Sequence, residues 1–363
     1  MNECKFCELC NKRSIKNFYD RVLYENNSFI VTPALGSVVE GYLMVISKRH
    51  INSMCYLNNE EKSDYIDLIN TFRELMKEKY NRYPILFEHG SADKDIDNSA
   101  SSIYHAHCHI VAHTFSNKEE LKANMGFEKL ENIEAFFRTG FDKTYIFYMN
   151  NNGDLYVRLN SGEAFQSQSM RIRIAEDISL NNNWNWKTHP HEENMMLTVD
   201  KFKKPLREKM GNKLKYIYYC RAMDGMNHDE VRAEYMSIEQ QLMENGLCLV
   251  NSISNDDHTL FDSKCKKMFN KENAQIIVSE NLRNIAKADC VLVNLSMKNH
   301  LYVGCIAEMI YSKLKGCYTI VVAGDSGADK YYYTLHHADL IVNSVEDAIA
   351  SITTMSKSAN GLS

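Results

Sequence analysis

The strongest constraint on the fold is a series of short, unbroken apolar runs after residue 213, separated by segments with helical periodicity. The runs that predict strands are 216–219, 247–250, 290–293, 318–322 and 340–342. The helical patterns among them cover 228–245, 282–287, 302–313 and 345–352. Apolar runs without polar alternation are typical of parallel strands that helices bury on both faces. This part of the chain therefore predicts a doubly wound α/β domain, whose ligands sit beyond the carboxyl ends of the strands.

The earlier part of the chain has a mixed pattern. Strand-like runs cover 29–31, 41–46, 83–88 and 105–113, and helical patterns cover 59–80, 118–123 and 129–138. Between the two patterns, residues 201–213 are dense in Lys and Arg and contain Pro205 and Gly211, which favours a boundary. We expect two domains, 1–205 and 214–363, joined by a linker over 206–213; a chain of 363 residues is long enough for both.

Composition excludes several classes of protein. The net charge of −5 gives no basic field, so we expect no nucleic-acid partner. No stretch approaches the ~20 apolar residues that span a bilayer, so we expect no membrane partner. The start of the chain lacks the apolar core of a signal peptide. With eleven scattered cysteines, an odd number, this predicts a cytoplasmic protein with free thiols, except where spacing indicates a metal.

The sharpest functional signal is the alternation of His105, His107 and His109 within a strand-like run. Alternate residues of a strand face the same side, so the three imidazoles share one surface. Such a set can bind a metal, or present one imidazole as a nucleophile to a phosphate while the others orient it and protonate a leaving group. The alternative is a strand rich in histidine by chance, and alternating triplets are rare.

A second signal is the Cys-x-x-Cys pair of Cys4 and Cys7. A zinc tetrahedron needs two more ligands, and His50 and His105 could supply them. The alternative is a pair of free thiols in a mobile N-terminal segment.

At these residues the chain resembles the histidine triad (HIT) superfamily. The resemblance rests on the opening Cys-x-Phe-Cys and on residues 41–50, 87–90 and 102–109; it extends through 184–187 and so covers about 1–205. It implies an α+β HIT-like fold around an antiparallel sheet, often dimeric. It also implies hydrolysis or transfer at a nucleotide α-phosphate through a nucleotidyl-histidine intermediate.

The resemblance assigns roles by position in the motif. His107 would be the nucleophile, His109 the second triad member near the phosphate, and Ser102 a phosphate-side hydroxyl. In zinc-bearing members the first triad histidine is a ligand, so the zinc set would be Cys4, Cys7, His50 and His105.

Two departures from the family pattern matter. Residues 100–101 are Ala-Ser where many members have Gly-Gln, and residues 29–33 offer no acidic group for ribose hydroxyls. A HIT-like scaffold that binds nucleotide without turnover therefore stays open.

In the second domain, polar residues follow or open several elements. Arg221 can face an anion, and Gly225 permits a tight turn before a helix. Glu308 lies in the first turns of a helix. A buried Glu there could attack the anomeric carbon of a nucleoside, and the plainer alternative is a Glu that complements the helix dipole.

Three short motifs here resemble the nucleoside 2-deoxyribosyltransferase family and its nucleotide N-glycosidase relatives, over about 214–353. They are Tyr-x-x-x-x-Met-x-Gly from Tyr218, Ala-Asp-x-x-Leu-x-Asn-Leu from Ala288, and Gly-x-x-x-Glu from Gly304. The resemblance implies a flavodoxin-like doubly wound parallel sheet. It also implies an oligomer in which a neighbouring copy completes each site.

By position in these motifs, Glu308 would be the nucleophile, Tyr218 would orient it or the sugar, and Arg221 and Gly225 would line the pocket. Asn281 stands where the family often has an Asp that protonates the leaving base, and an amide can hold a base but cannot act as that acid. The other residues expected at the substrate site are Asp289, Asn294 and Gly304.

We therefore expect a cytoplasmic, homo-oligomeric, two-domain nucleotide-processing enzyme with a structural zinc and a nucleotide or nucleoside substrate. The first domain would act at a phosphate through His107, and the second would bind, and cleave, an N-glycosidic bond through Glu308. The main alternative is a second domain that senses a nucleotide signal and regulates the first. A third is an inactive nucleotide-binding module, against which the intact triad argues.

Overall fold

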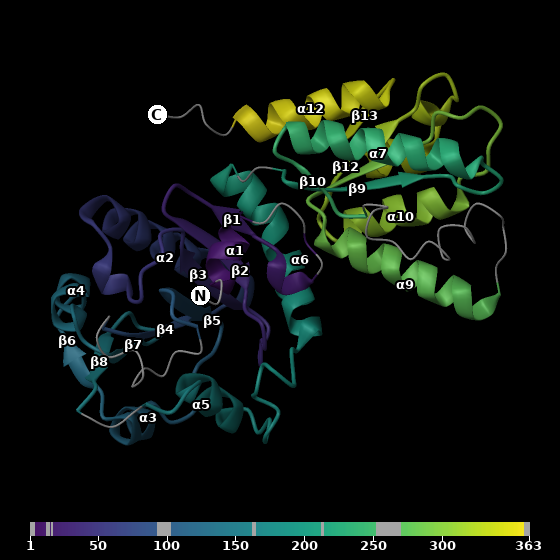
Figure 1. Cartoon of the computed structure of the whole chain (residues 1–363). Coiled ribbons are helices and arrows are strands. Elements are labelled where there is room, and N and C mark those ends of the chain that lie inside the picture. The colour runs from purple at the N-terminus through teal and green to yellow at the C-terminus, as the bar shows by residue number, and fades with distance from the viewer. Residues whose placement is uncertain are drawn as a thin grey trace. The chain divides into compact units, whose positions relative to one another are not determined.

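The computed structural model describes residues 4–11, 15, 17–92, 103–161, 165–211, 214–251 and 270–358. Its contacts divide the chain into two compact units, the first running through Val199 and the second beginning at Asp200. Figure 1 shows one sheet in each unit. Each unit builds its own core, and each is described by itself below.

The first unit is built on an eight-stranded sheet in the order β1-β2-β3-β5-β4-β7-β8-β6. Every pairing in it is antiparallel, as predicted. The strands are β1 (Tyr24–Glu25), β2 (Phe29–Pro33), β3 (Tyr42–Ser47), β4 (Ile85–Gly90), β5 (His107–Val111), β6 (Glu128–Leu130), β7 (Tyr145–Met149) and β8 (Leu155–Leu159). The helices are α1 (Lys5–Asn11), α2 (Asn59–Tyr80), α3 (Lys118–Met125), α4 (Ile133–Gly140) and α5 (Ser169–Asp177), with short 3₁₀ turns at Phe18–Asp20 and Met54–Tyr56. Helix α6 (Glu192–Met210) begins in this unit and continues past Val199 into the second.

Helix α2 explains which face of this sheet is left for a site. Asn58 caps the helix, accepting from the backbone N–H of Glu61, and the apolar face that follows is buried. Tyr65 on that face contacts Phe29 of the sheet, with ring centroids 5.8 Å apart. Since side chains alternate along a strand, Cys108 faces the α2 side and the flanking His107 and His109 face the opposite side.

Two expectations for this part of the chain need correction. Residues 129–138 are not one helix: β6 occupies 128–130, and α4 begins at Ile133 because Asn132 caps it by accepting from the Ala135 N–H. The expected linker over 206–213 is helical as far as Met210, since α6 continues through Pro205. Phe202 and Leu206 bury one face of that helix, and this packing offsets the hydrogen bond that proline cannot make.

Glu88 on β4 is a buried carboxyl group in the first unit. It is 1% exposed and accepts hydrogen bonds from the Met54 N–H and the Tyr145 hydroxyl, both at 2.8 Å. Removal from water raises its pKa from 4.5 to about 8. The neutral acid is therefore the form that the fold accommodates.

This burial predicts that the first unit loses stability as the pH rises. A folded-state pKa above the unfolded one gives stability that is complete below pH 4.5 and is lost as the pH passes through about 8. We expect a loss of up to about 4 kcal/mol between pH 5 and pH 9, and expect Glu88→Gln to remove that component. Calorimetric unfolding midpoints across this range measure it. The exposed Glu119→Gln is the control, and an unchanged pH slope in Glu88→Gln contradicts the prediction.

The second unit is built on a five-stranded sheet in the order β10-β9-β11-β12-β13, with every pairing parallel, as predicted. The strands are β9 (Tyr216–Arg221), β10 (Cys248–Leu249), β11 (Cys290–Asn294), β12 (Tyr318–Val322) and β13 (Leu340–Val342). Counted within the unit, the order is 2-1-3-4-5, a common doubly wound order. The helices are α7 (His228–Glu244), α9 (Lys271–Lys287), α10 (Val303–Leu314), α11 (Tyr332–His337) and α12 (Val345–Ser358).

Helices cover both faces of this parallel sheet (Figure 1). One apolar cluster joins α9 and α10 to the sheet through Ile285 and Met309. The other joins α7 and α12 to the opposite face through Ile238 and Ile349. This double cover is the reason for the unbroken apolar runs of the strands.

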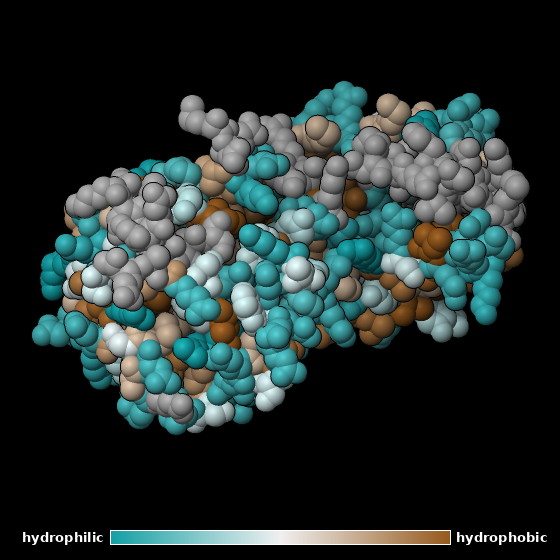
Figure 2. All heavy atoms as spheres, turned by 60° about the horizontal axis from the view of Figure 1, so that its bottom comes forward, coloured by the Kyte–Doolittle hydropathy of each residue, from teal (hydrophilic) through white to brown (hydrophobic). Residues whose placement is uncertain are grey.

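Among the described residues, no helix combines the length and apolarity that crossing a membrane requires. On the face drawn in Figure 2, hydrophilic side chains separate the exposed hydrophobic ones, so the hydrophobic side chains form no continuous band.

Candidate functional site

His107 and His109 lie at the start of β5. The Nδ1 atom of His107 is 2.7 Å from the backbone oxygen of His105. A carbonyl oxygen only accepts, so Nδ1 carries the proton of this ring. Burial lowers the pKa of His107 to about 4, so the ring is neutral at pH 7. The Nε2 atom is therefore left with a free lone pair.

His109 lies beside His107 on the same face of the strand. The two ring centroids are 5.1 Å apart, and His109 stacks on Phe87 at 4.5 Å. Burial holds the pKa of His109 well below its ordinary value, so this ring is neutral too. Its Nδ1 atom is buried without a hydrogen-bond partner among the described residues. A buried polar atom of this kind is available to a ligand.

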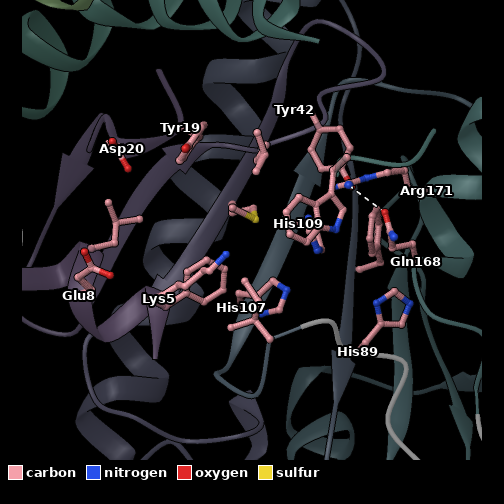
Figure 3. Close-up of a pocket in the computed structure, with 17 residues that line it drawn as sticks. Lys5, Glu8, Tyr19, Asp20, Tyr42, His89, His107, His109, Gln168 and Arg171 are labelled. Carbon is pink, nitrogen blue, oxygen red and sulfur yellow. Dashed lines mark hydrogen bonds between the residues drawn. The ribbon is translucent and has the colours of Figure 1, made fainter. Parts of the chain in front are cut away.

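Both histidines open into a cavity of about 380 Å³, a volume suited to a small molecule (Figure 3). The wall also contains His89, Gln168, Arg171 and nine apolar or aromatic side chains, namely Phe6, Leu9, Tyr19, Leu35, Tyr42, Met44, Phe87, Ile103 and Trp186. Across the histidines from Arg171, the view shows Lys5, Glu8 and Asp20. The cavity thus has a basic end and a mixed end that carries two carboxylates.

The four residues expected to hold zinc come together. One ligand atom from each of Cys4, Cys7, His50 and His105 lies within 4.8 Å of every other. The Nε2–H of His105 donates to the Ser47 carbonyl at 2.7 Å, which turns Nδ1 toward Cys4 Sγ at 3.3 Å and Cys7 Sγ at 3.6 Å. A backbone partner that fixes the free nitrogen of a ligating histidine is typical of metal sites. This Cys₂His₂ set fits tetrahedral zinc.

In the second unit, Glu308 meets two of the residues expected near it. The Tyr218 hydroxyl donates to one carboxylate oxygen at 3.1 Å, and the Asn281 amide donates to the other at 2.7 Å. Tyr218 comes from β9, Asn281 from α9 and Glu308 from α10. Two donors hold this carboxylate in one orientation.

Arg221 and Asn294 belong to a neighbouring network at the carboxyl ends of β9 and β11. Arg221 forms an ion pair with Glu234, and the Tyr219 hydroxyl donates to the same Glu234 carboxylate. The Asn294 amide donates to that hydroxyl at 2.9 Å. Sequence reasoning missed Glu234. The signal was an acidic residue three positions after Val231, on the apolar face of a predicted helix.

The remaining expected residues are placed differently. Gly225 has a φ of 72°, in the left-handed region, within the turn after β9. Gly304 lies in the first turn of α10 beside open space. Asp289 stands before β11, at the amino end of the sheet, and its carboxylate accepts from the Lys215 and Tyr216 N–H groups at 3.0 Å. We therefore correct its assignment to the substrate site. Ser102 lies outside the described residues.

Residues 3–124 match a family model described as "Scavenger mRNA decapping enzyme C-term binding". The matched segment contains the whole Cys₂His₂ set together with His107 and His109, and it ends before α5. This match supports a HIT-like domain in the first unit.

Solved structures with some similarity include three HIT proteins. A HIT-like protein from Bartonella henselae, described as involved in cell-cycle regulation, is 18% identical, with a TM-score of 0.26. The match covers 31% of this chain and 76% of the Bartonella chain. A HIT-family member from Bacillus subtilis is 18% identical over 30% and 72%, with a TM-score of 0.26. A zinc-bound histidine triad protein from Mycobacterium smegmatis is 15% identical over 32% and 78%, with a TM-score of 0.27. No curated protein matches the chain.

Proposed function

We propose that the first unit hydrolyses or transfers at the α-phosphate of a nucleotide, with His107 as the nucleophile. One observation carries this proposal: the Nδ1–H of His107 donates to the His105 carbonyl, which leaves the Nε2 of a neutral ring with a lone pair. A neutral imidazole in a cavity is a competent nucleophile toward phosphorus.

The reaction balances as two displacements at phosphorus. The Nε2 lone pair of His107 forms an N–P bond while the bond from phosphorus to the leaving oxygen breaks. That oxygen keeps the electron pair and takes a proton. Water then attacks phosphorus, loses a proton and displaces the histidine, which regains its neutral form. His109, whose neutral ring carries one N–H, donates a hydrogen bond to the phosphoryl group.

We propose that Cys4, Cys7, His50 and His105 hold a structural zinc. The ion would cross-link the N-terminal segment, which supplies Cys4 and Cys7, to the residues next to two paired strands, since His50 follows β3 and His105 precedes β5. The chain's own residues then carry the reaction: His105 offers its carbonyl to His107, and α1 contributes Phe6 to the cavity.

The covalent intermediate is the direct test for the first unit. We expect a short incubation with a mixed nucleotide panel, stopped by denaturation at alkaline pH, to leave one nucleotidyl group on the peptide that contains His107. The phosphoramidate should disappear on brief acid treatment. Peptide mass spectrometry measures both. Product formation with no adduct at His107, even in rapid-quench samples, contradicts the assignment.

We propose that the second unit is a flavodoxin-like domain, similar to the nucleoside 2-deoxyribosyltransferases, that binds a nucleoside or nucleotide at Glu308 and cleaves its N-glycosidic bond. The 2-1-3-4-5 strand order and the hydrogen bonds from Tyr218 and Asn281 to the carboxylate support it. Glu308 attacks the anomeric carbon and forms a glycosyl ester, and the base leaves with the electron pair of the broken bond and takes a proton. Water, or a second base, then attacks the same carbon, loses a proton and releases Glu308 as its carboxylate. We also propose a cytoplasmic homo-oligomer whose sites a second copy completes.

One observation favours the alternative, a nucleotide sensor that regulates the first unit. The group beside the Glu308 carboxylate is the Asn281 amide, which cannot act as the acid for a leaving base. A site of this kind can bind without turning its ligand over.

Glu308→Gln separates the two functions. We expect it to lower the release of free base from deoxynucleosides and nucleoside monophosphates by about 10³-fold, because an amide does not form the glycosyl ester. Mass spectrometry of the released base measures the effect, and the exposed Glu272→Gln is the control. If the wild type binds these ligands and releases no base, the sensor replaces the glycosidase.

A further inference from the structure

Arg171 on α5 is a cation buried in the wall of the first unit's cavity. The residue is only 6% exposed. One terminal nitrogen donates to the Gln168 side-chain oxygen at 3.2 Å, and the guanidinium carbon lies 5.4 Å from the Tyr42 ring centroid. The Nε–H is buried without a hydrogen-bond partner among the described residues. Figure 3 shows the guanidinium beside Gln168, next to His109.

This cation has no anion of its own in the described part of the chain. Gln168 is neutral, and no carboxylate there forms an ion pair with Arg171. The two carboxylates that line the cavity, Glu8 and Asp20, lie across the histidines from it (Figure 3). Arginine does not lose its proton in proteins, and a buried unpaired charge is strongly disfavoured. The cavity is therefore built to receive an anion at this end.

His89, which lines the same wall, cannot supply the positive charge that a phosphate needs. Burial lowers the pKa of His89 to about 3, so this ring is neutral at pH 7. The charge of Arg171 contributes to lowering that pKa. Lys5, the other cation at this cavity, is exposed on α1.

We infer that Arg171 is a catalytic residue of the first unit, which binds the charged nonbridging oxygen of the phosphoryl group that His107 attacks. The inference rests on the proposed function and deepens it. A phosphodiester or anhydride phosphoryl group of a nucleotide carries one negative charge at this position, and one buried guanidinium matches it. The Arg171 guanidinium is already in place when the neutral imidazole of His107 attacks. It therefore stabilises the charge on the nonbridging oxygen without reorganisation of the site.

No motif marks this residue. It lies beyond the matched segment, which ends at residue 124, in a helix that the sequence patterns did not predict. A specific contribution from α5 would explain why this cavity does without the Gly-Gln pair of many HIT proteins.

The test compares a charged substrate with an uncharged one. We expect Arg171→Ala to lower kcat/KM by about 10²- to 10³-fold for p-nitrophenyl esters of nucleoside 5′-monophosphates. For the matching methylphosphonates, in which a methyl group replaces the charged oxygen, we expect a change below about 5-fold, because the interaction that Arg171 would make is absent. Millimolar guanidinium ion should restore part of the loss in Arg171→Ala and do nothing for the wild type.

Two further variants keep the result interpretable. Arg173→Ala removes a partly exposed arginine from the same helix, one that is paired with Glu176, and should leave kcat/KM unchanged. Arg171→Lys keeps the charge and packing and should fall between wild type and Arg171→Ala. Equal losses on the charged and uncharged substrates, or no loss in Arg171→Ala, overturn the inference.

Measurements of ligand affinity distinguish a failure of this inference from a failure of the proposed function. By calorimetry, we expect Arg171→Ala to weaken the binding of nucleoside 5′-monophosphates at least 10-fold, and that of the parent nucleosides by less than 2-fold. If the wild type turns over no nucleotide yet shows this difference, the proposed function fails and the anion site stands. If both proteins bind the monophosphates equally, the inference is overturned whatever the turnover.

Discussion

His107→Ala is expected to lower the rate of phosphate-bond cleavage by about 10⁴-fold or more, the largest effect of any single substitution in the first unit. The reason is geometric. The neutral ring of His107 presents an Nε2 lone pair, because Nδ1–H is committed to the His105 carbonyl. In the variant, water attacks the phosphate directly, and only substrate binding and the remaining polar groups of the cavity accelerate that reaction. Initial rates of monophosphate release from a nucleotide panel measure it.

Two comparisons sharpen this result. His109→Ala should cost less, about 10²-fold, because it removes a hydrogen-bond donor and leaves the nucleophile. The control is His336→Ala, which removes an exposed imidazole from the second unit and should leave the rate unchanged. A His107→Ala protein that retains a tenth or more of the wild-type rate would contradict the assignment and point to another nucleophile.

Loss of the metal is expected to be the largest effect on stability. We expect about one zinc per chain, and expect Cys7→Ser to remove it and to lower the free energy of unfolding of the first unit by about 3 kcal/mol or more. The ligands join α1 to the end of β3 and the start of β5, and α1 buries Phe6 and Leu9 in the core. Without the ion, that helix of seven residues keeps only its apolar contacts.

Metal analysis and thermal unfolding of the full chain measure these effects. The matched control is Cys10→Ser in the same helix, whose Sγ lies 3.9 Å from the Ser47 carbonyl and takes no part in the cluster. It should keep the zinc and the wild-type unfolding midpoint. Chelation should reproduce the effect of Cys7→Ser. The prediction is contradicted if wild-type protein purified from zinc-supplemented cultures contains no metal, and if chelation leaves its unfolding midpoint unchanged.

Local patterns in the sequence were enough for much of the fold. Each strand and helix expected after residue 213 is present, because parallel strands covered on both faces need unbroken apolar runs. Helix α2 follows equally from its cap at Asn58 and its apolar spacing. In the first unit, β7 and β8 escaped prediction, and residues 129–130 of β6 were predicted as part of a helix. Short strands next to helical patterns give weak local signals, and their pairing in the sheet decides their conformation.

The candidate sites divide in the same way. Spacing along a strand is enough to put His107 and His109 on one face. The Cys-x-x-Cys pair needs two further ligands, the HIT resemblance implies His50 and His105, and the structure brings all four within 4.8 Å. Zinc and the roles of these residues stay predictions. Asp289 shows the opposite case, since only the direction of β11 reveals that its carboxylate serves the backbone at the amino end of the sheet.

The two sheet types and the shared face of His107 and His109 follow from the sequence alone, because backbone periodicity sets each of these locally. The tertiary structure brings His50 and His105 to Cys4 and Cys7. Only the tertiary structure decided which charges meet. It pairs Arg221 with Glu234, turns Asn281 toward Glu308, and buries Arg171 at a cavity with no carboxylate ion-paired to it among the described residues. The partners of these side chains come from elements far apart in the chain, so local sequence patterns do not predict their contacts.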